Sequence, residues 1–435
     1  NHRDNFKSDT DGVSVTGQWA NEWLRVGARH ARDALDSGLP GSLSAAQYAA
    51  NPEQATTPDD RASIDNSRSS LFAEARLGSW QLAADIGTRD KQLRSTSAFG
   101  LYAYDIEADS HALSARHESG GSSLRNTLQF GTDYNRWERR VIAGGSSLAK
   151  HRSRAWYARN EVTLVDTGTA LSIGARTEDI DKTFTGTTGL EDSLHAWELG
   201  LSQRVGAEVT LYGRIGRSFR LANADEFSFT TPGVALQPQI SRDTELGARW
   251  QRGTNSVDAR LYRSALENEI GYDPAGPGPF GPGANVNFDP TKRQGLELDA
   301  AYALFPSLSL RGNLALREST FRSGPYVGKD VPLAPKQTVS VRADWSPVQG
   351  HRLVGGVTRV SSQSPDFANA CRMPSYTTAD ARYALQWGKA ELALGVANLF
   401  DRKFYTQAFG CTAGVTGSIY PEAGRVVTAS LRVSF

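Results

Sequence analysis

The chain contains 435 residues, with a formal net charge of +1, an apolar content of 39% and a mean hydropathy of −0.44. This near-neutral charge argues against binding to nucleic acid or to an acidic partner. The sequence contains no run of 18 apolar residues that could form a transmembrane helix. The 42 glycines and 9 tryptophans are typical of a turn-rich all-β protein with aromatic rings at interfaces.

Alternating apolar and polar residues recur from one end of the chain to the other. Between Ser307 and Arg317, for example, leucines lie on one face and Ser309, Arg311 and Asn313 lie on the opposite face. Alternation with a period of two residues is the signature of a β-strand with one apolar and one polar face. The pattern predicts about nineteen strands, near 11–19, 22–33, 69–78, 80–93, 102–118, 123–136, 150–165, 168–182, 194–204, 207–219, 240–251, 255–268, 290–303, 307–319, 336–346, 350–362, 375–386, 389–398 and 425–435.

The connections between these predicted strands alternate between short and long. The short ones lie at 20–21, 78–79, 120–121, 166–167, 206, 252–253, 305–306, 347–349 and 388. The long ones lie near 34–68, 94–101, 137–149, 183–193, 220–239, 269–289, 320–335, 363–374 and 399–424. The fold of a soluble β-sandwich does not require every long loop to lie at the same end of the strands. A bacterial outer-membrane barrel has this arrangement, with tight turns in the periplasm and long loops outside.

The positions of the tryptophans support a barrel. Most of them lie within a few residues of a short turn, and two others lie toward the long-loop ends of their strands. Indole rings at both ends of a strand are expected in the aromatic girdles of a membrane barrel. Tryptophans buried in the core of a soluble protein would show no preference for short turns over long loops. The residues near short turns are Trp19, Trp23, Trp80, Trp250, Trp345 and Trp387, and the other two are Trp156 and Trp197.

The predicted strand count is odd. If Phe435, at the end of the last alternating run, lies on the periplasmic side, then Asn1 lies on the outer side. Single-chain bacterial barrels have even strand numbers and both ends in the periplasm. We therefore expect N-terminal strands beyond the present residues, with one miscounted strand as the alternative.

Three blocks of sequence resemble one family. Residues 216–227, GRSFRLANADEF, resemble the G-x-S-F-R-x-P-x-x-x-E-L block of TonB-dependent outer-membrane transporters, although Ala222 stands where proline is usual. Leu236-Gln237-Pro238 and Thr244-Glu245-Leu246-Gly247 then follow, similar to the L-x-P-E-x-S-x-x-x-E-x-G block of that family. With the two further blocks described next, and with the order of all three along a barrel pattern, the chain resembles the family over essentially its whole length.

The second and third blocks lie further along the chain. Residues 287–297 resemble the N-x-x-x-x-x-x-x-G-x-E strand entry, with matches at Asn287, Gly295 and Glu297. The segments 398–405 and 420–425 resemble the closing N-L-F-D-x-x-Y and P-G-R signatures of the family.

The resemblance implies an all-β, 22-stranded transmembrane antiparallel barrel, of which residues 1–435 would supply the last nineteen strands. The plug domain, the TonB box and three strands would lie outside these residues. The implied function is an outer-membrane receptor that binds a large scarce ligand and imports it with energy from TonB. The expected ligand is a small-molecule metal chelate, most simply a ferric siderophore, with cobalamin or haem as alternatives. A passive porin or a barrel adhesin is the competing hypothesis.

The resemblance also implies the surroundings of the protein. It would be a monomer in the lipid of the Gram-negative outer membrane, inserted by the barrel-assembly machinery, for which Phe435 would be the terminal signal. We find no G-x-S-x-G or H-E-x-x-H motif and no metal-ligand spacing among the histidines, and therefore expect neither catalysis, nor a cofactor, nor a metal site.

Two sets of side chains are candidates for interactions at the mouth and in the lumen. Aromatic residues of the outer loops could grip a ligand or could pack the loops together; they are Trp137, Tyr272, Phe280, Tyr326, Phe367, Phe409 and Tyr420. Arginines on the polar face of the strands would bind a plug or, in an open pore, would favour anions; they are Arg214, Arg249, Arg260, Arg311, Arg342 and Arg432.

The two cysteines, Cys371 and Cys411, lie in the last two long loops. Because an outer-membrane protein folds in an oxidising compartment, we expect a disulfide between them, with two free thiols as the alternative. Such a bond would tie the two loops together over the barrel mouth.

Overall fold

The computed structural model describes residues 3–186, 189–279 and 281–434, and almost all of its regular structure is β-strand. The alternation along the sequence explains this, because each strand presents one apolar and one polar face. The strands are β1 (Ser8–Ala20), β2 (Leu24–Gly38), β3 (Arg61–Leu77), β4 (Trp80–Ser97), β5 (Gly100–Gly120), β6 (Leu124–Ala143), β7 (Leu148–Leu164), β8 (Thr169–Phe184), β9 (Leu190–Val205), β10 (Val209–Arg220), β11 (Gln239–Arg252), β12 (Asn255–Glu267), β13 (Ile270–Gly278), β14 (Gly281–Asn287), β15 (Thr291–Phe305), β16 (Leu308–Phe321), β17 (Gln337–Trp345), β18 (His351–Val360), β19 (Tyr376–Trp387), β20 (Ala390–Ala397), β21 (Tyr405–Thr412), β22 (Val415–Pro421) and β23 (Val426–Val433).

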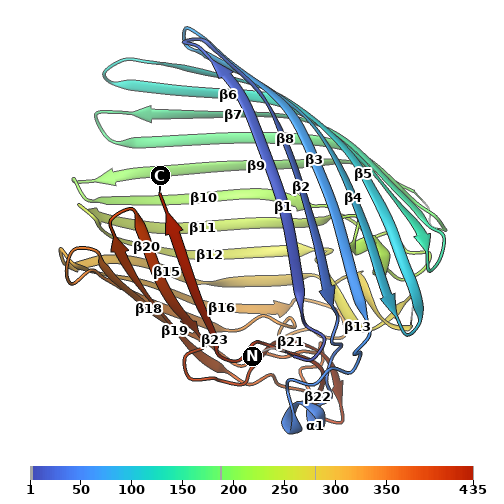
Figure 1. Ribbon diagram of the computed structural model, residues 1–435. Helices are drawn as coiled ribbons and strands as arrows, with labels where there is room; N and C mark the ends of the chain where they lie inside the picture. The colour runs from blue at the N-terminus through green and yellow to red at the C-terminus, as the bar shows by residue number, and fades with distance from the viewer. Residues whose placement is uncertain (1–2, 187–188, 280, 435) are drawn as a thin grey trace.

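Nineteen strands form one curled antiparallel sheet, as the sequence predicted. Each strand pairs with the next one along the chain, except that β12 pairs with β15 and β20 pairs with β23. Within the described residues, β1 pairs only with β2 and β23 pairs only with β20. The sheet curves into the wall of a barrel, with its short turns at one end and its longer connections at the other (Figure 1). The predicted all-β fold class is confirmed.

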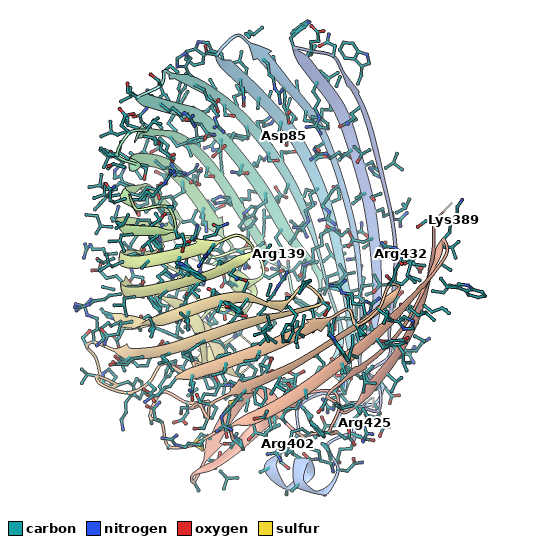
Figure 2. All side chains as sticks on the ribbon, turned by 90° about the vertical axis from the view of Figure 1, so that its left-hand side faces the viewer. Asp85, Arg139, Lys389, Arg402, Arg425 and Arg432 are labelled. Atoms are coloured by element: carbon teal, nitrogen blue, oxygen red, sulfur yellow. A yellow bond between two sulfur atoms is a disulfide. The ribbon has the colours of Figure 1, made fainter. Side chains whose placement is uncertain are left out.

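The two faces of this wall differ in polarity. Large apolar side chains such as Leu71, Ile173, Leu246 and Val427 are more than half exposed on the outer face. The alternate residues point to the concave side and are largely polar; Figure 2 labels Asp85 and Arg139 among them. This is the reverse of a soluble protein, in which the apolar face of a sheet is buried. Seven of the eight predicted girdle tryptophans, including Trp19 and Trp156, are likewise exposed, whereas Trp250 is partly buried and donates a hydrogen bond to Glu208.

Strand length varies strongly around the wall. β5 has 21 residues, whereas β20 has 8. The prediction of long connections is wrong at three places, because β4 to β9 continue through most of the residues concerned. These places are 94–101, 137–149 and 183–193. The outer parts of these strands carry polar residues on both faces, and backbone pairing there does not depend on side-chain polarity.

The remaining long connections contain structure of their own. The connection after β2 holds helix α1 (Ala45–Ala50), which begins with a capping box between Ser44 and Gln47. A short 3₁₀ helix, η1 (Glu226–Phe229), follows β10. β13 and β14 form one small hairpin and β21 and β22 form another. None of the helices that the structure describes has the length and apolarity to cross a membrane.

Candidate ligand-binding site

A cavity of about 870 Å³ lies among the long connections. Its lining comes from the segments that follow β2, β10, β12, β16, β18 and β20, which are far apart in the sequence. The structure brings five of the seven predicted aromatic residues to this one cavity: Tyr272, Tyr326, Phe367, Phe409 and Tyr420. The cavity is therefore the candidate site for a ligand arriving at this end of the barrel.

The aromatic rings of the cavity support one another. The ring of Phe409 packs edge-to-face against those of Tyr272 and Tyr420, with centroids 5.4 and 5.9 Å apart. Phe367 is nearly buried, and its centroid lies 5.4 Å from that of Tyr326 and 5.0 Å from that of Phe288. Phe367 thus packs the loops together, whereas Tyr272 and Tyr420 keep about two-fifths of their surface exposed.

The polar lining of the cavity is acidic. Asp273 and Asp366 are the acidic residues among its described lining residues, and no lysine or arginine is among them. The Tyr272 hydroxyl also lies in this lining, and burial together with nearby Tyr420 and Asp273 raises the pKa of its phenol. Tyr272 therefore remains a neutral hydrogen-bond donor at physiological pH. The sequence did not identify these two aspartates as site residues, because each lies in a loop without a motif and only the fold brings them to the same cavity.

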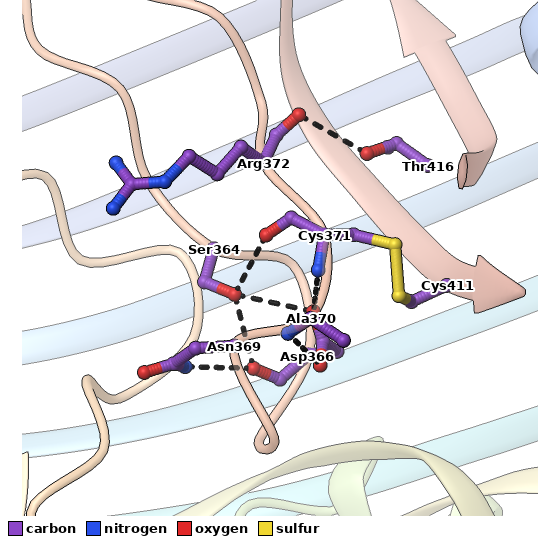
Figure 3. Close-up of a disulfide and its surroundings, with 8 residues drawn as sticks. All are labelled: Ser364, Asp366, Asn369, Ala370, Cys371, Arg372, Cys411 and Thr416. Atoms are coloured by element: carbon purple, nitrogen blue, oxygen red, sulfur yellow. Dashed lines mark hydrogen bonds between the residues drawn. A yellow bond between two sulfur atoms is a disulfide. The ribbon is translucent and has the colours of Figure 1, made fainter. Parts of the chain in front are cut away.

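A disulfide joins Cys371 and Cys411 at the edge of this cavity, as the sequence predicted (Figure 3). The two Cα atoms are 5.7 Å apart, within the usual range for a disulfide. On the Cys371 side, Asp366 accepts hydrogen bonds from the backbone N–H groups of Cys371 and Ala370, each 2.9 Å long. Because the two sulfur atoms are bonded to each other, neither is a thiolate that could bind a metal.

The other predicted aromatic residues do not join the cavity. The prediction that Trp137 belongs to an outer loop is wrong: it lies within β6, points inward and stacks on His151 with centroids 5.4 Å apart. It also packs beside Phe227, so its role is to support the segment after β10. Phe280 and Phe435 lie outside the described residues.

The predicted lumen arginines lie on the concave face, where several pair with carboxylates of neighbouring strands. Arg214 bridges Glu198 and Glu245, at 3.7 and 3.6 Å, and Arg260 continues the row to Glu245 and Glu297. This row of alternating charges crosses β9, β10, β11, β12 and β15, so the wall partly neutralises its own arginines.

The strand register determines what the other four predicted lumen arginines lie beside. Arg249 pairs with Asp258 at 2.7 Å, and Arg342 pairs with Asp380 at 2.9 Å. Arg311 lies opposite Arg342, and Arg432 lies opposite Glu391.

The first of the three family-like blocks folds into a fixed segment on the inner wall. Arg220 forms a two-pronged pair with Glu226, with contacts of 3.0 Å, and Glu226 also accepts a hydrogen bond from the Asn223 backbone N–H. Asp225 accepts a 2.6 Å hydrogen bond from Tyr104 and forms a 3.2 Å ion pair with Lys91. The residues of this block therefore hold the segment after β10 in place.

Basic side chains of the wall also hold this segment, and sequence reasoning missed them. Lys182 is buried and donates a 2.8 Å hydrogen bond to the backbone carbonyl of Ala222. Arg139 is almost completely buried, with its guanidinium 4.1 Å from the Tyr104 ring centroid. No sequence signal separates these residues from other polar residues of alternating strands.

The other two blocks also have structural roles. The Asn287 amide donates hydrogen bonds to the backbone carbonyls of Gln237 and Asn268, which ties the end of β14 to the loop before β11 and to the turn after β12. At Gly295, an added Cβ would lie 2.2 Å from the Leu316 carbonyl oxygen, so a larger residue does not fit. The buried Asn398 has a positive φ of 47° and donates hydrogen bonds to the carbonyls of Arg402 and Ala423, which closes the turn after β20.

Comparison with known proteins agrees with this geometry. A family model for the TonB dependent receptor-like beta-barrel matches residues 2–399. The ferrioxamine receptor of Yersinia enterocolitica is 23% identical over 379 residues, which cover 78% of this chain and 51% of that receptor. The metal-pseudopaline receptor CntO of Pseudomonas aeruginosa is 25% identical over 254 residues, or 54% of this chain and 33% of the relative. The chain thus spans about half the length, or less, of these relatives.

Solved structures show the same fold at low sequence identity. The unliganded ferric citrate transporter FecA matches with a TM-score of 0.82 at 19% identity, over 98% of this chain and 70% of that chain. The ferric yersiniabactin uptake receptor FyuA from Yersinia pestis matches with a TM-score of 0.81 at 15% identity, over 98% of this chain and 71% of that chain. Through the match to residues 2–399, the chain belongs to the family of TonB-dependent receptor-like β-barrels.

Proposed function

We propose that residues 1–435 are the barrel domain of an outer-membrane receptor that binds a ferric siderophore at the loop cavity and imports it with energy from TonB. The observation that carries this proposal is the convergence of five aromatic residues from separate connections on one cavity of about 870 Å³. Rigid aromatic rings in a concave site suit a large amphipathic ligand. The relatives that are receptors for ferrioxamine and for metal-pseudopaline support the same class of cargo.

The rest of the proposal concerns the surroundings of the barrel. The exposed apolar outer face suits the lipid of the Gram-negative outer membrane, and the terminal Phe435 would be read by the barrel-assembly machinery. The lumen arginines would contact a plug on which TonB acts. The protein would work as a monomer and would catalyse no reaction.

Binding and uptake by the natural gene product test this proposal. Tyr272→Ala should weaken binding of its ferric siderophore about fivefold, because one aromatic contact contributes on the order of 1 kcal/mol. Tyr272→Phe should restore most of the affinity. Tyr302→Ala, which removes an exposed ring from the outer wall, is the matched control and should leave binding unchanged.

The competing hypothesis of a passive pore or adhesin predicts a different outcome in cells. Uptake of the iron chelate should stop in a strain that lacks TonB. Uptake that continues there, rising in proportion to concentration and without saturation, would instead support a pore. An upstream gene segment encoding a compact domain and a TonB box would agree with transport, whereas a bare signal peptide would agree with a pore.

A further inference from the structure

We infer that the loop cavity selects ferric chelates by charge: it favours a chelate with a net positive charge, as in an iron trihydroxamate with an alkylammonium tail, and disfavours anionic triscatecholates. This inference rests on the proposed function and adds the chemical class of its ligand. It starts from the charged residues of the described lining, Asp273 and Asp366, which are both acidic.

The two carboxylates in the lining are fixed in position. Asp273 accepts a 2.9 Å hydrogen bond from the Ala275 backbone N–H and is half-buried. Asp366 accepts hydrogen bonds from two backbone N–H groups and from the Ser364 hydroxyl. All of these donors are neutral, so neither carboxylate has its charge balanced by an ion pair among these bonds.

The nearest arginine in the sequence does not balance them either. Arg372 follows Cys371, but its guanidinium donates a hydrogen bond to the Ser362 hydroxyl and extends away from Asp366 (Figure 3). It is not among the described lining residues of the cavity. An anionic ligand would therefore meet two like charges with no cation beside them, an arrangement that lowers affinity most at low ionic strength.

The aromatic lining acts in the same direction as the carboxylates. The faces of tyrosine and phenylalanine rings carry negative electrostatic potential and attract cations, ammonium groups in particular. Tyr272, Phe409 and Tyr420 lie together in the lining, and Asp273 directly follows Tyr272. The cavity therefore offers a cationic group both ring faces and carboxylates in one lining, whereas an anionic group gains from neither.

A matched series of chelates tests the inference on the natural gene product, purified from outer membranes in detergent. The probes are the ferric complex of a linear trihydroxamate that ends in a protonated amine, its N-acetylated form, its N-succinylated form and a ferric triscatecholate. The first three share one iron centre and differ in tail charge. Affinity should fall in that order, by about tenfold between the ammonium and succinyl forms at low salt, and the gap should narrow as salt is added.

Charge-neutral variants identify the source of the discrimination. Asp273→Asn should tighten binding of the succinylated complex and weaken binding of the ammonium form, reducing the gap to about threefold. Asp59→Asn makes the same charge change at an exposed loop residue outside the lining and should leave the gap unchanged. A triscatecholate that binds as tightly as the ammonium complex would overturn the inference and leave the proposed function intact. Binding of none of the four probes would overturn both.

Discussion

At the scale of single residues, the motifs that resemble the family mainly hold loops to the wall, although Tyr420, at the start of the closing signature, also lines the cavity. Asp225 shows how this works. Partial desolvation raises the pKa of its carboxyl, but the hydrogen bond from Tyr104 and the charge of Lys91 outweigh that effect, and the pKa lies below its ordinary value. A lowered pKa in the folded state means that the ionised carboxylate stabilises the docked segment.

The pH dependence of this docking follows from the direction of the shift. The contribution of Asp225 should be fully present from neutral pH down to about pH 4, and should be lost as the pH falls further through the lowered value. A dye attached at Val234→Cys, in the same connection, would report release as a fall in anisotropy. In an Asp225→Asn background the segment should already be mobile at neutral pH. A protein that releases the segment near pH 6 would contradict this assignment.

At the scale of elements, the disulfide ties the β21–β22 hairpin to the connection between β18 and β19. It spans 40 residues of sequence, and the chain-entropy model gives such a loop roughly 3–4 kcal/mol of stabilisation. The hairpin is also held by its bridge from Ile419 to Leu43 and by the buried cluster around Met373. Loss of the disulfide should therefore loosen the hairpin without detaching it.

Hydrogen exchange on the Cys371→Ala/Cys411→Ala double variant would measure this effect. Exchange should rise in β21 and β22, while β19 and β20, which lie between the two cysteines in sequence, should remain protected, since their ladder does not depend on the bond. Binding of the chelate should weaken, because Phe409 and Tyr420 of the hairpin line the cavity. Unfolding of the whole wall on loss of the disulfide would show that this account of the tie is wrong.

The elements also show what the sequence could and could not predict. Alternation identified all nineteen wall strands, since a wall with one apolar and one polar face has to alternate. It did not find the outer ends of β4 to β9, the β13–β14 and β21–β22 hairpins or helix α1, because their stability comes from pairing and packing between distant segments. For the same reason, the sequence identified the aromatic residues of the loops but could not show that five of them meet at one cavity. Trp137 was misplaced because its strand runs further than its apolar residues do.

At the scale of the whole molecule, the short turns and the long connections lie at opposite ends of the wall. The proposed orientation places the long connections outside the cell. An impermeant thiol reagent on intact cells should label Val234→Cys but not Thr254→Cys, which lies in a short turn. Thr254 is preferable to the neighbouring Gly253, whose φ of 59° disfavours a side chain. Thr187, an obvious alternative site, lies outside the described residues. Labelling of Thr254→Cys alone would reverse the orientation.

The unequal strands also give the wall an oblique rim. At about 3.3 Å per residue, β5 is about 70 Å long and β20 about 26 Å, while the apolar band of such barrels is about 25 Å tall. In the proposed orientation, the crest formed by β4 to β7 would stand clear of the membrane, and the cavity is lined by connections that follow other strands. On the proposed function, a particle as large as an antibody would reach this crest first, whereas a small chelate would pass beyond it. Substitutions on the crest would then change which large particles recognise the cell and leave uptake of the chelate unchanged.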